Sequence, residues 1–155
     1  MKKNGFSLIE LLAVLVIIGI LAAISIAIYT NALNESRNSL SKVQIAQLID
    51  ASRKYVALET INFNRLFDGM SNDPDSGCVA LEVKVLTKEG LISQDVVDPK
   101  DTGKNLEGYI KITYSYINNQ YEYKYVDTSV NTTLCIYKYY VDNNDVVQVP
   151  KGVKE

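Results

Sequence analysis

One carboxylate stands inside an apolar segment near the start of the chain. The segment runs from Phe6 to Ile28, and Glu10 is its single ionisable residue. A carboxylate in a membrane helix costs about 2.5 kcal/mol or more, so it calls for a cationic partner. The chemistry that Glu10 suggests is therefore charge pairing between groups, not turnover of a substrate.

The apolar segment predicts a membrane-spanning helix. Leu8 to Ile28 is long enough, since about 20 apolar residues cross a bilayer. Lys2 and Lys3 place the preceding leader on the cytoplasmic side. A secretory signal peptide, cut for example after Ala23, would have a shorter apolar core of about 7–15 residues. A plain uncleaved anchor would explain the length but not Glu10.

The residues around this segment resemble a known family. Lys2 to Gly5, followed by the sequence FSLIELL, is similar to the prepilin leader and cleavage junction of type IV pilins and the related pseudopilins. The resemblance implies that a prepilin peptidase cuts between Gly5 and Phe6 and that the new amine of Phe6 is methylated. In that family the acid at the position of Glu10 pairs with the N-terminal amine of a neighbouring subunit, which would supply the missing cation.

The helical pattern continues beyond the apolar segment, and we expect one helix from about Phe6 to Thr60. Its amphipathic half, residues 29–61, should seat a small domain through a broad apolar stripe. The members of this stripe are Leu33, Leu40, Val43, Leu48, Ala51, Tyr55, Leu58 and Ile61. A narrower second set, Ile45, Ile49 and Val56, either contacts neighbouring subunits or widens the same seat.

The rest of the chain predicts a loop, a short helix and a sheet. Residues 62–77 carry many turn formers and predict a loop. Residues 78–92 alternate like a strand, but the glycine and apolar pair at their end favour a short helix. Residues 108–150 predict three to four antiparallel strands, with a type I′ turn at Asn118-Asn119. That turn pairs Tyr116 with Tyr121, Tyr114 with Tyr123 and Ile112 with Tyr125.

These elements define an α+β chain. Residues 1–5 form the leader, residues 6–28 the membrane and assembly half of the helix, and residues 29–155 the headgroup, in which a loop and short helix occupy 62–107. A long N-terminal helix packed on a small antiparallel sheet is the fold of the pilins that the chain resembles.

Cys78 and Cys135 are the two cysteines of the chain. The anchor would place their domain outside the cytoplasm, where a disulfide can form. In the chain-entropy model, such a bond would contribute about 4 kcal/mol. Two buried thiols are the alternative.

Composition argues against several other kinds of chemistry. The chain has no histidine and a net charge of −2, with its basic residues scattered among acidic ones, so we expect neither an enzyme nor a nucleic-acid-binding surface. No metal or cofactor is predicted. Asp95, Asp98 and Asp101 are weak candidates for calcium, which prefers several carboxylate oxygens, but solvated turn residues explain them more simply.

The function expected from the resemblance is structural. The chain would reside in the cytoplasmic membrane and then polymerise with other copies into a surface fibre that serves adhesion or motility. Prepilin peptidase, an assembly motor and platform proteins would be its partners. A pseudopilin of a type II secretion or DNA-uptake machine, and a minor pilin that acts as a membrane-tethered binding module, are the alternatives.

Overall fold

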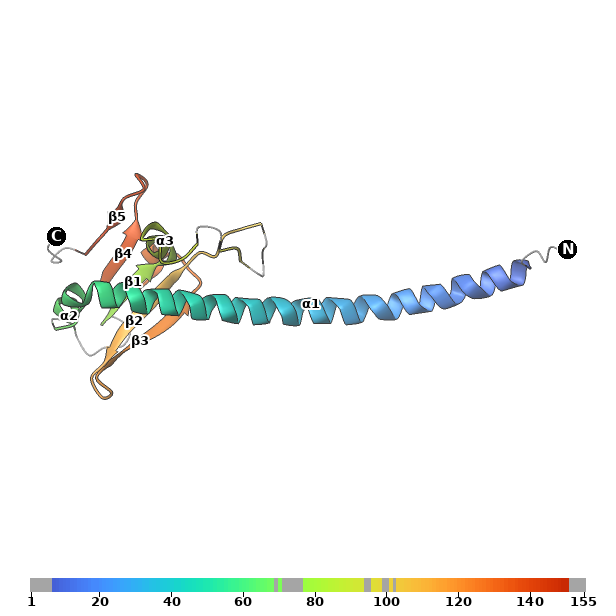
Figure 1. The fold of residues 1–155 in the computed structure, drawn as a ribbon, viewed down its shortest axis with the longest axis horizontal. Coiled ribbons are helices and arrows are strands. Elements are labelled where there is room, and N and C mark those ends of the chain that lie inside the picture. The colour runs from blue at the N-terminus through green and yellow to red at the C-terminus, as the bar shows by residue number, and fades with distance from the viewer. Residues whose placement is uncertain are drawn as a thin grey trace. The chain divides into compact units, whose positions relative to one another are not determined.

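The computed structural model describes residues 7–68, 70, 77–93, 96–98, 101 and 103–150. By its internal contacts the chain divides into two compact units, Met1–Ser39 and Leu40–Glu155. We describe each unit by itself. The first consists of the N-terminal part of one helix, and the second contains the C-terminal part of that helix and a sheet (Figure 1).

Helix α1 spans Leu8–Leu58, close to the predicted limits. Within the described residues it is the one helix long and apolar enough to cross a membrane, and none of its most apolar window is buried. Between Leu8 and Ile28 the helix therefore carries apolar side chains on all sides, which is typical of a helix that lies in lipid or among other helices.

A second helix follows where the sequence predicted a loop. Helix α2 spans Thr60–Asp68 and buries Phe63, Leu66 and Phe67 at intervals of three and four residues. The loop prediction was wrong for residues 62–68, because the two asparagines there were weighed as turn formers, although they lie on the solvent side of the helix or at its margin. Residues 69 and 71–76 of the predicted loop lie outside the described residues. Tertiary burial of one apolar face outweighs such weak local preferences.

The sheet has five strands in the order β3-β2-β1-β4-β5. Their bounds are Cys78–Glu82 for β1, Tyr109–Ser115 for β2, Gln120–Val126 for β3, Tyr137–Val141 for β4 and Val147–Gln148 for β5. Strands β1 and β4 are parallel, and the other pairs are antiparallel. The α+β layout is confirmed, but the sheet is mixed and has one strand more than predicted.

Strand β1 is a second element that the sequence prediction missed. The expected helix over residues 78–92 begins only at Val83, where α3 (Val83–Lys88) follows the strand directly. Four of the five residues of β1 are buried, because β1 lies in the middle of the sheet and both of its faces are covered. The predicted helix end is correct: Gly90 has φ +69°, and the Leu91 amide donates to the Leu86 carbonyl at 2.9 Å.

The hairpin of β2 and β3 forms as predicted, but its register is shifted by two residues. Tyr114 faces Tyr121, Ile112 faces Tyr123 and Ile110 faces Tyr125. The two strands are separated by four residues, because only Asn119 of the Asn-Asn pair has positive φ, whereas a type I′ turn requires two. A shift of two preserves the face of every side chain, so the tyrosines still pack against the core.

The face of α1 that seats the sheet differs from the predicted broad stripe. Leu48, Ala51 and Tyr55 are buried as expected. Val56 is also buried and Ile49 packs against the core, so the second apolar set widens the seat of the domain. Four members of the broad stripe remain exposed instead: Leu40, Val43, Leu58 and Ile61.

Tyr139 of β4 lies at the centre of this core and is fully buried. Its ring stacks on Phe63 at 5.3 Å between centroids and meets the ring of Tyr55 edge-on at 5.8 Å. Its hydroxyl has no hydrogen-bond partner within the described part of the chain. Burial raises the pKa of the Tyr139 phenol well above its ordinary value, so the group stays neutral.

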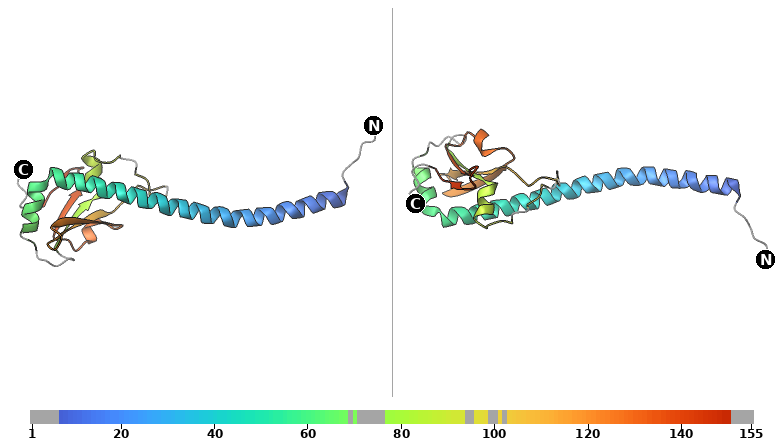
Figure 2. Two further views of the ribbon diagram at one scale, coloured as in Figure 1. Left: turned by 60° about the horizontal axis from the view of Figure 1, so that its bottom comes forward. Right: turned by 90° about the horizontal axis from the view of Figure 1, so that it is seen from above.

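The opposite face of the sheet is covered by the crossover from β3 to β4, which includes the short 3₁₀ helix η1 (Val130–Thr132). The views in Figure 2 show that α1 and this crossover lie on different sides of the sheet. Val130 packs there against Ala80 and Tyr109. The Cys78–Cys135 disulfide fastens the end of the crossover to the first residue of β1.

We expect the disulfide to contribute strongly to stability. It closes a separation of 57 residues, for which the chain-entropy model gives about 4 kcal/mol. The double variant Cys78→Ser, Cys135→Ser should therefore unfold at a markedly lower temperature, measured by near-UV circular dichroism of the tyrosines in detergent. An unchanged unfolding temperature would show that packing of Val130 holds the crossover without the bond.

Gly108 should tolerate no side chain. Its φ is +128°, and an added Cβ would collide with the Val126 carbonyl oxygen and lie 3.1 Å from the Tyr125 ring. We expect Gly108→Ala to lower the free energy of unfolding by about 2 kcal/mol or more. Gly103→Ala is the matched control, because its Cβ would meet only Asp101 Oδ1, at 3.6 Å. Equal stability of the two variants would contradict this assignment.

Candidate functional site at the start of helix α1

Ser7 and Glu10 form a reciprocal cap at the first turn of α1. The backbone amide of Ser7 donates to Glu10 Oε2 at 3.0 Å, and the Ser7 hydroxyl donates to the same oxygen at 3.1 Å. The Glu10 amide in turn donates to Ser7 Oγ at 3.3 Å. Serine followed three residues later by glutamate is the capping box, which satisfies backbone donors that a helix end otherwise leaves unpaired.

This arrangement gives Glu10 a partner before any other subunit is present. The N-terminal end of a helix carries partial positive charge, which favours a carboxylate in the first turn. Both hydrogen bonds use Oε2, so Oε1 has no hydrogen bond within the described residues. One oxygen thus holds the local cap, while the other remains able to accept a hydrogen bond from outside.

Ser7 is the functional residue that the sequence reasoning missed. Glu10 was singled out for its charge, whereas no role was predicted for Ser7. The spacing of Ser7 and Glu10 just before an apolar helix was the signal that identifies a capping box. Gly5 and Phe6, the predicted cleavage and methylation residues, lie outside the described residues.

Comparison with known proteins bears on the same segment. Residues 1–26 match the model of the prokaryotic N-terminal methylation motif. The chain thus begins with the prepilin leader of type IV pilins, followed by an apolar helix, and the resemblance seen in the sequence is confirmed for this segment. No curated protein and no solved structure matched the chain.

The aspartates considered for calcium form no metal site within the described residues. Asp95 lies outside the described residues. Asp101 forms an ion pair with Lys104 at 3.1 Å, and its Oδ1 accepts the Gly103 amide. The hydrogen bond from Lys104, with that from Gly103, holds the pKa of Asp101 below its ordinary value. Within the described residues, no group of three potential metal ligands occurs.

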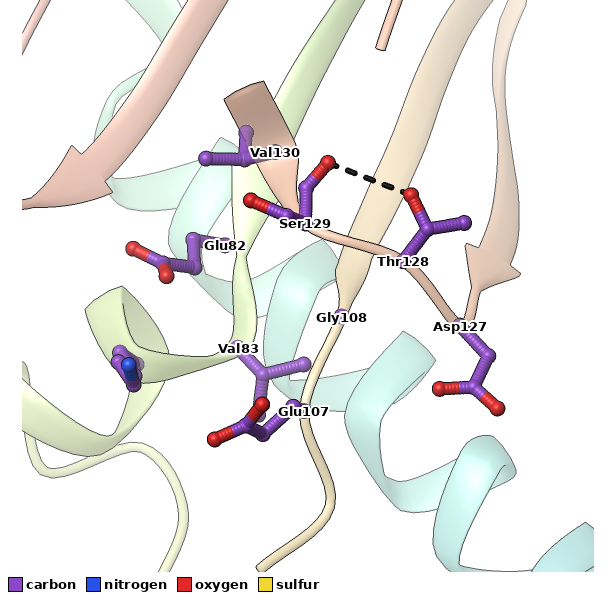
Figure 3. Close-up of a pocket in the computed structure, with 9 residues that line it drawn as sticks. Glu82, Val83, Glu107, Gly108, Asp127, Thr128, Ser129 and Val130 are labelled. Carbon is purple, nitrogen blue, oxygen red and sulfur yellow. Dashed lines mark hydrogen bonds between the residues drawn. The ribbon is translucent and has the colours of Figure 1, made fainter. Parts of the chain in front are cut away.

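Acidic residues also line a cavity of about 180 Å³ at the ends of β1, β2 and β3 (Figure 3). Glu82, Glu107 and Asp127 all contribute to its lining. However, Glu82 Oε2 accepts the Val141 amide at 2.8 Å, at the point where β1 has ended and can no longer pair with β4. The Glu82 carboxylate therefore completes the sheet, and we assign the cavity no ligand.

The capping box predicts a local effect of removing one hydroxyl. Ser7→Ala deletes two of the three hydrogen bonds of the cap, and loss of such a cap costs about 1 kcal/mol. We expect faster hydrogen exchange of the Glu10 and Leu11 amides, measured by NMR of the full chain in detergent micelles.

Ser25→Ala is the control for this measurement, because the Ser25 hydroxyl bonds to the Leu21 carbonyl in the middle of the helix and caps no helix end. Unchanged exchange at Glu10 in Ser7→Ala would mean that the cap does not hold the first turn.

Proposed function

We propose that this chain is the structural subunit of a type IV pilus. The observation that carries the proposal is Glu10, an acid in the first turn of an apolar helix, directly after a prepilin leader. Cleavage after Gly5 would leave a free amine on Phe6, which would then be methylated. Glu10 Oε1, which accepts no hydrogen bond from the described residues, is suited to accept that amine from the next subunit, while Oε2 keeps its own helix capped.

The mechanism would be assembly without turnover. In the membrane, lipid covers the apolar side chains of α1 from Leu8 to Ile28. In a fibre, the same side chains of neighbouring copies would replace the lipid, and the pairing of Glu10 with an amine would set the register between subunits. An assembly motor and its platform would supply the work of extraction, and the headgroups would form the fibre surface outside the cell.

A pseudopilin of a secretion or DNA-uptake machine would use the same leader and the same helix. The two functions differ in the length and place of the fibre. A pilin produces fibres that can be sheared from the cell surface at native expression. A pseudopilin supports export or uptake without such fibres.

The proposal predicts that Glu10→Val leaves membrane insertion intact and abolishes fibres, because the charge pair is lost while the helix stays apolar. Sheared fibres would be measured by electron microscopy and immunoblotting. Glu35→Val is the matched control, since Glu35 is an exposed acid of the same helix beyond the apolar segment. Normal fibres from Glu10→Val would refute the assigned role.

Mass spectrometry of the mature chain tests the processing step. We expect the first five residues to be absent and Phe6 to carry one N-methyl group. An intact leader, or a cut after Ala23, would instead support a plain anchor or a secretory signal peptide.

A further inference from the structure

Strand β3 forms a long open edge of the sheet. The strand order places β3 at one end of the sheet, and the strand has seven residues, Gln120–Val126. The opposite end is β5, which has only two residues. Within the described residues, no strand pairs with the outer side of β3. A long strand with one unpaired side is a ready template for a further strand.

The outer face of β3 carries an acid and a base two positions apart. Glu122 and Lys124 are both exposed, and neither forms an ion pair within the described part of the chain. In their own sheet, Glu122 lies opposite Thr113 and Lys124 lies opposite Lys111. Equal charges on opposite residues of neighbouring strands are destabilising. Lys124 would therefore gain from an acid on its open side.

This spacing makes β3 complementary to a second β3 that runs antiparallel to it. When the Tyr123 residues of two copies lie opposite each other, Glu122 of each copy lies opposite Lys124 of the other. A shift of two residues brings Glu122 against Glu122 or Lys124 against Lys124. An odd shift places outer-face residues against core-face residues, and larger even shifts leave less than half of the strand paired. One register alone therefore brings the opposite charges together.

The core face of β3 suits the same register. Tyr121, Tyr123 and Tyr125 alternate with the charged residues and are half-buried. Tyr121 of one copy would face Tyr125 of the other, and aromatic pairs across strands are favourable. Two of the rings are already held in place: the Tyr121 hydroxyl donates to Asn64 Oδ1 at 2.6 Å, and the Arg53 guanidinium lies 5.6 Å from the Tyr123 ring centroid. Pairing would thus cost little side-chain freedom.

Symmetry fixes the relative direction of two copies that pair in this way. A contact in which the same strand meets itself has a two-fold axis, and in one continuous antiparallel sheet this axis is perpendicular to the sheet. The part of α1 that packs on the sheet lies along its core face (Figure 1), so the axis reverses its direction. Copies of one fibre would have parallel helices, so they cannot form this pair with each other.

We propose that β3, Gln120–Val126, is a self-recognition edge, which pairs antiparallel with β3 of a second copy and is centred on Tyr123. This inference rests on the proposed function, in which the copies of one fibre are parallel. The edge would thus join two fibres that run in opposite directions, or copies in two membranes that face each other. So narrow a contact would be weak for one pair of copies, but a fibre would repeat it many times, and repeated contacts act together.

Charge reversal in vesicles tests the edge without requiring fibres. The full chain would be reconstituted in phosphatidylcholine vesicles with its headgroup outside, and clustering of the vesicles would be measured by light scattering. We expect the natural chain to cluster them. Glu122→Lys and Lys124→Glu should each lower clustering about tenfold, because equal charges then meet. The double variant should restore clustering, because each charge again meets its opposite.

Glu89→Lys is the matched control, because Glu89 is an exposed acid outside β3, and this variant should cluster vesicles like the natural chain. Near-UV circular dichroism of each variant would confirm that the headgroup is folded. Dispersed vesicles with the natural chain, full clustering by either single variant, or no recovery in the double variant would each overturn the edge.

Cysteine linking between fibres tests the register. Both natural cysteines are held in the buried internal disulfide, so an added cysteine supplies the reactive thiol. Fibres with Glu122→Cys and fibres with Lys124→Cys, carrying tags of different size, would be mixed and mildly oxidised. One charge pair stays intact in this mixture. Opposite residues of antiparallel strands have Cα atoms about 5 Å apart, and a disulfide needs about 7 Å or less, so dimers should contain both tags.

Thr113→Cys mixed with Lys124→Cys is the control for the register. Thr113 lies on the same face of the sheet but on β2, away from the edge, so this mixture should remain unlinked. Equal linking in the two mixtures would overturn the register. Linking of residues 122 and 124 to a different protein instead of to a second copy would overturn self-recognition.

The two proposals fail in different ways. Clustered vesicles from a chain that yields no fibres in its own cells would retain the edge and overturn the pilus function. Normal fibres that neither link nor depend on the two charges would overturn the edge and leave the pilus function intact. Loss of fibres in Glu122→Lys would place β3 inside the fibre, which also overturns the edge.

Discussion

Helix α1 has an apolar first part and an amphipathic last part, and these two parts need different surroundings. The rest of the structure depends on this constraint. The first part of α1 is apolar on every side, and the last part is apolar toward a sheet and polar toward water. A headgroup of this size covers only one face of the helix it grips. The surplus apolar surface therefore has to be covered by lipid or by other protein.

The Glu10 carboxylate at the start of α1 also needs suitable surroundings. A carboxylate near hydrocarbon is tolerated when hydrogen bonds and a helix end surround it. Ser7 provides those bonds within the subunit. Glu10 therefore has hydrogen-bond partners within its own subunit. Under the proposed function, assembly would add an amine at Oε1 and leave the bonds at Oε2 in place.

The helix and the hairpin could be predicted from the sequence because their signals are local. An apolar run followed by helical periodicity defined α1, and alternating tyrosines on both sides of an asparagine pair defined β2 and β3. Strand β1 could not be predicted in this way. Cys78 to Glu82 pairs with strands that come much later in the chain, and the local pattern fitted a helix equally well.

The details that the sequence left open depend on three-dimensional contacts. The register of the hairpin was decided by the backbone of Asn118 and Asn119, which adopted one positive φ instead of two. The seat of α1 was decided by which side chains the sheet could reach, so Val56 became buried and Leu40 did not. At the start of α1, Glu10 was recognised from its charge, whereas its partner Ser7 could be recognised only from the helix-capping pattern.

The covalent link between the first residue of β1 and the end of the crossover has a consequence for biogenesis. Thiols stay reduced in the cytoplasm, where leader peptides face during insertion. Under the proposed function, the Cys78–Cys135 bond would form only after the headgroup has crossed the membrane. Completion of the headgroup would then depend on its arrival in an oxidising compartment, and a subunit left on the cytoplasmic side would lack the bond.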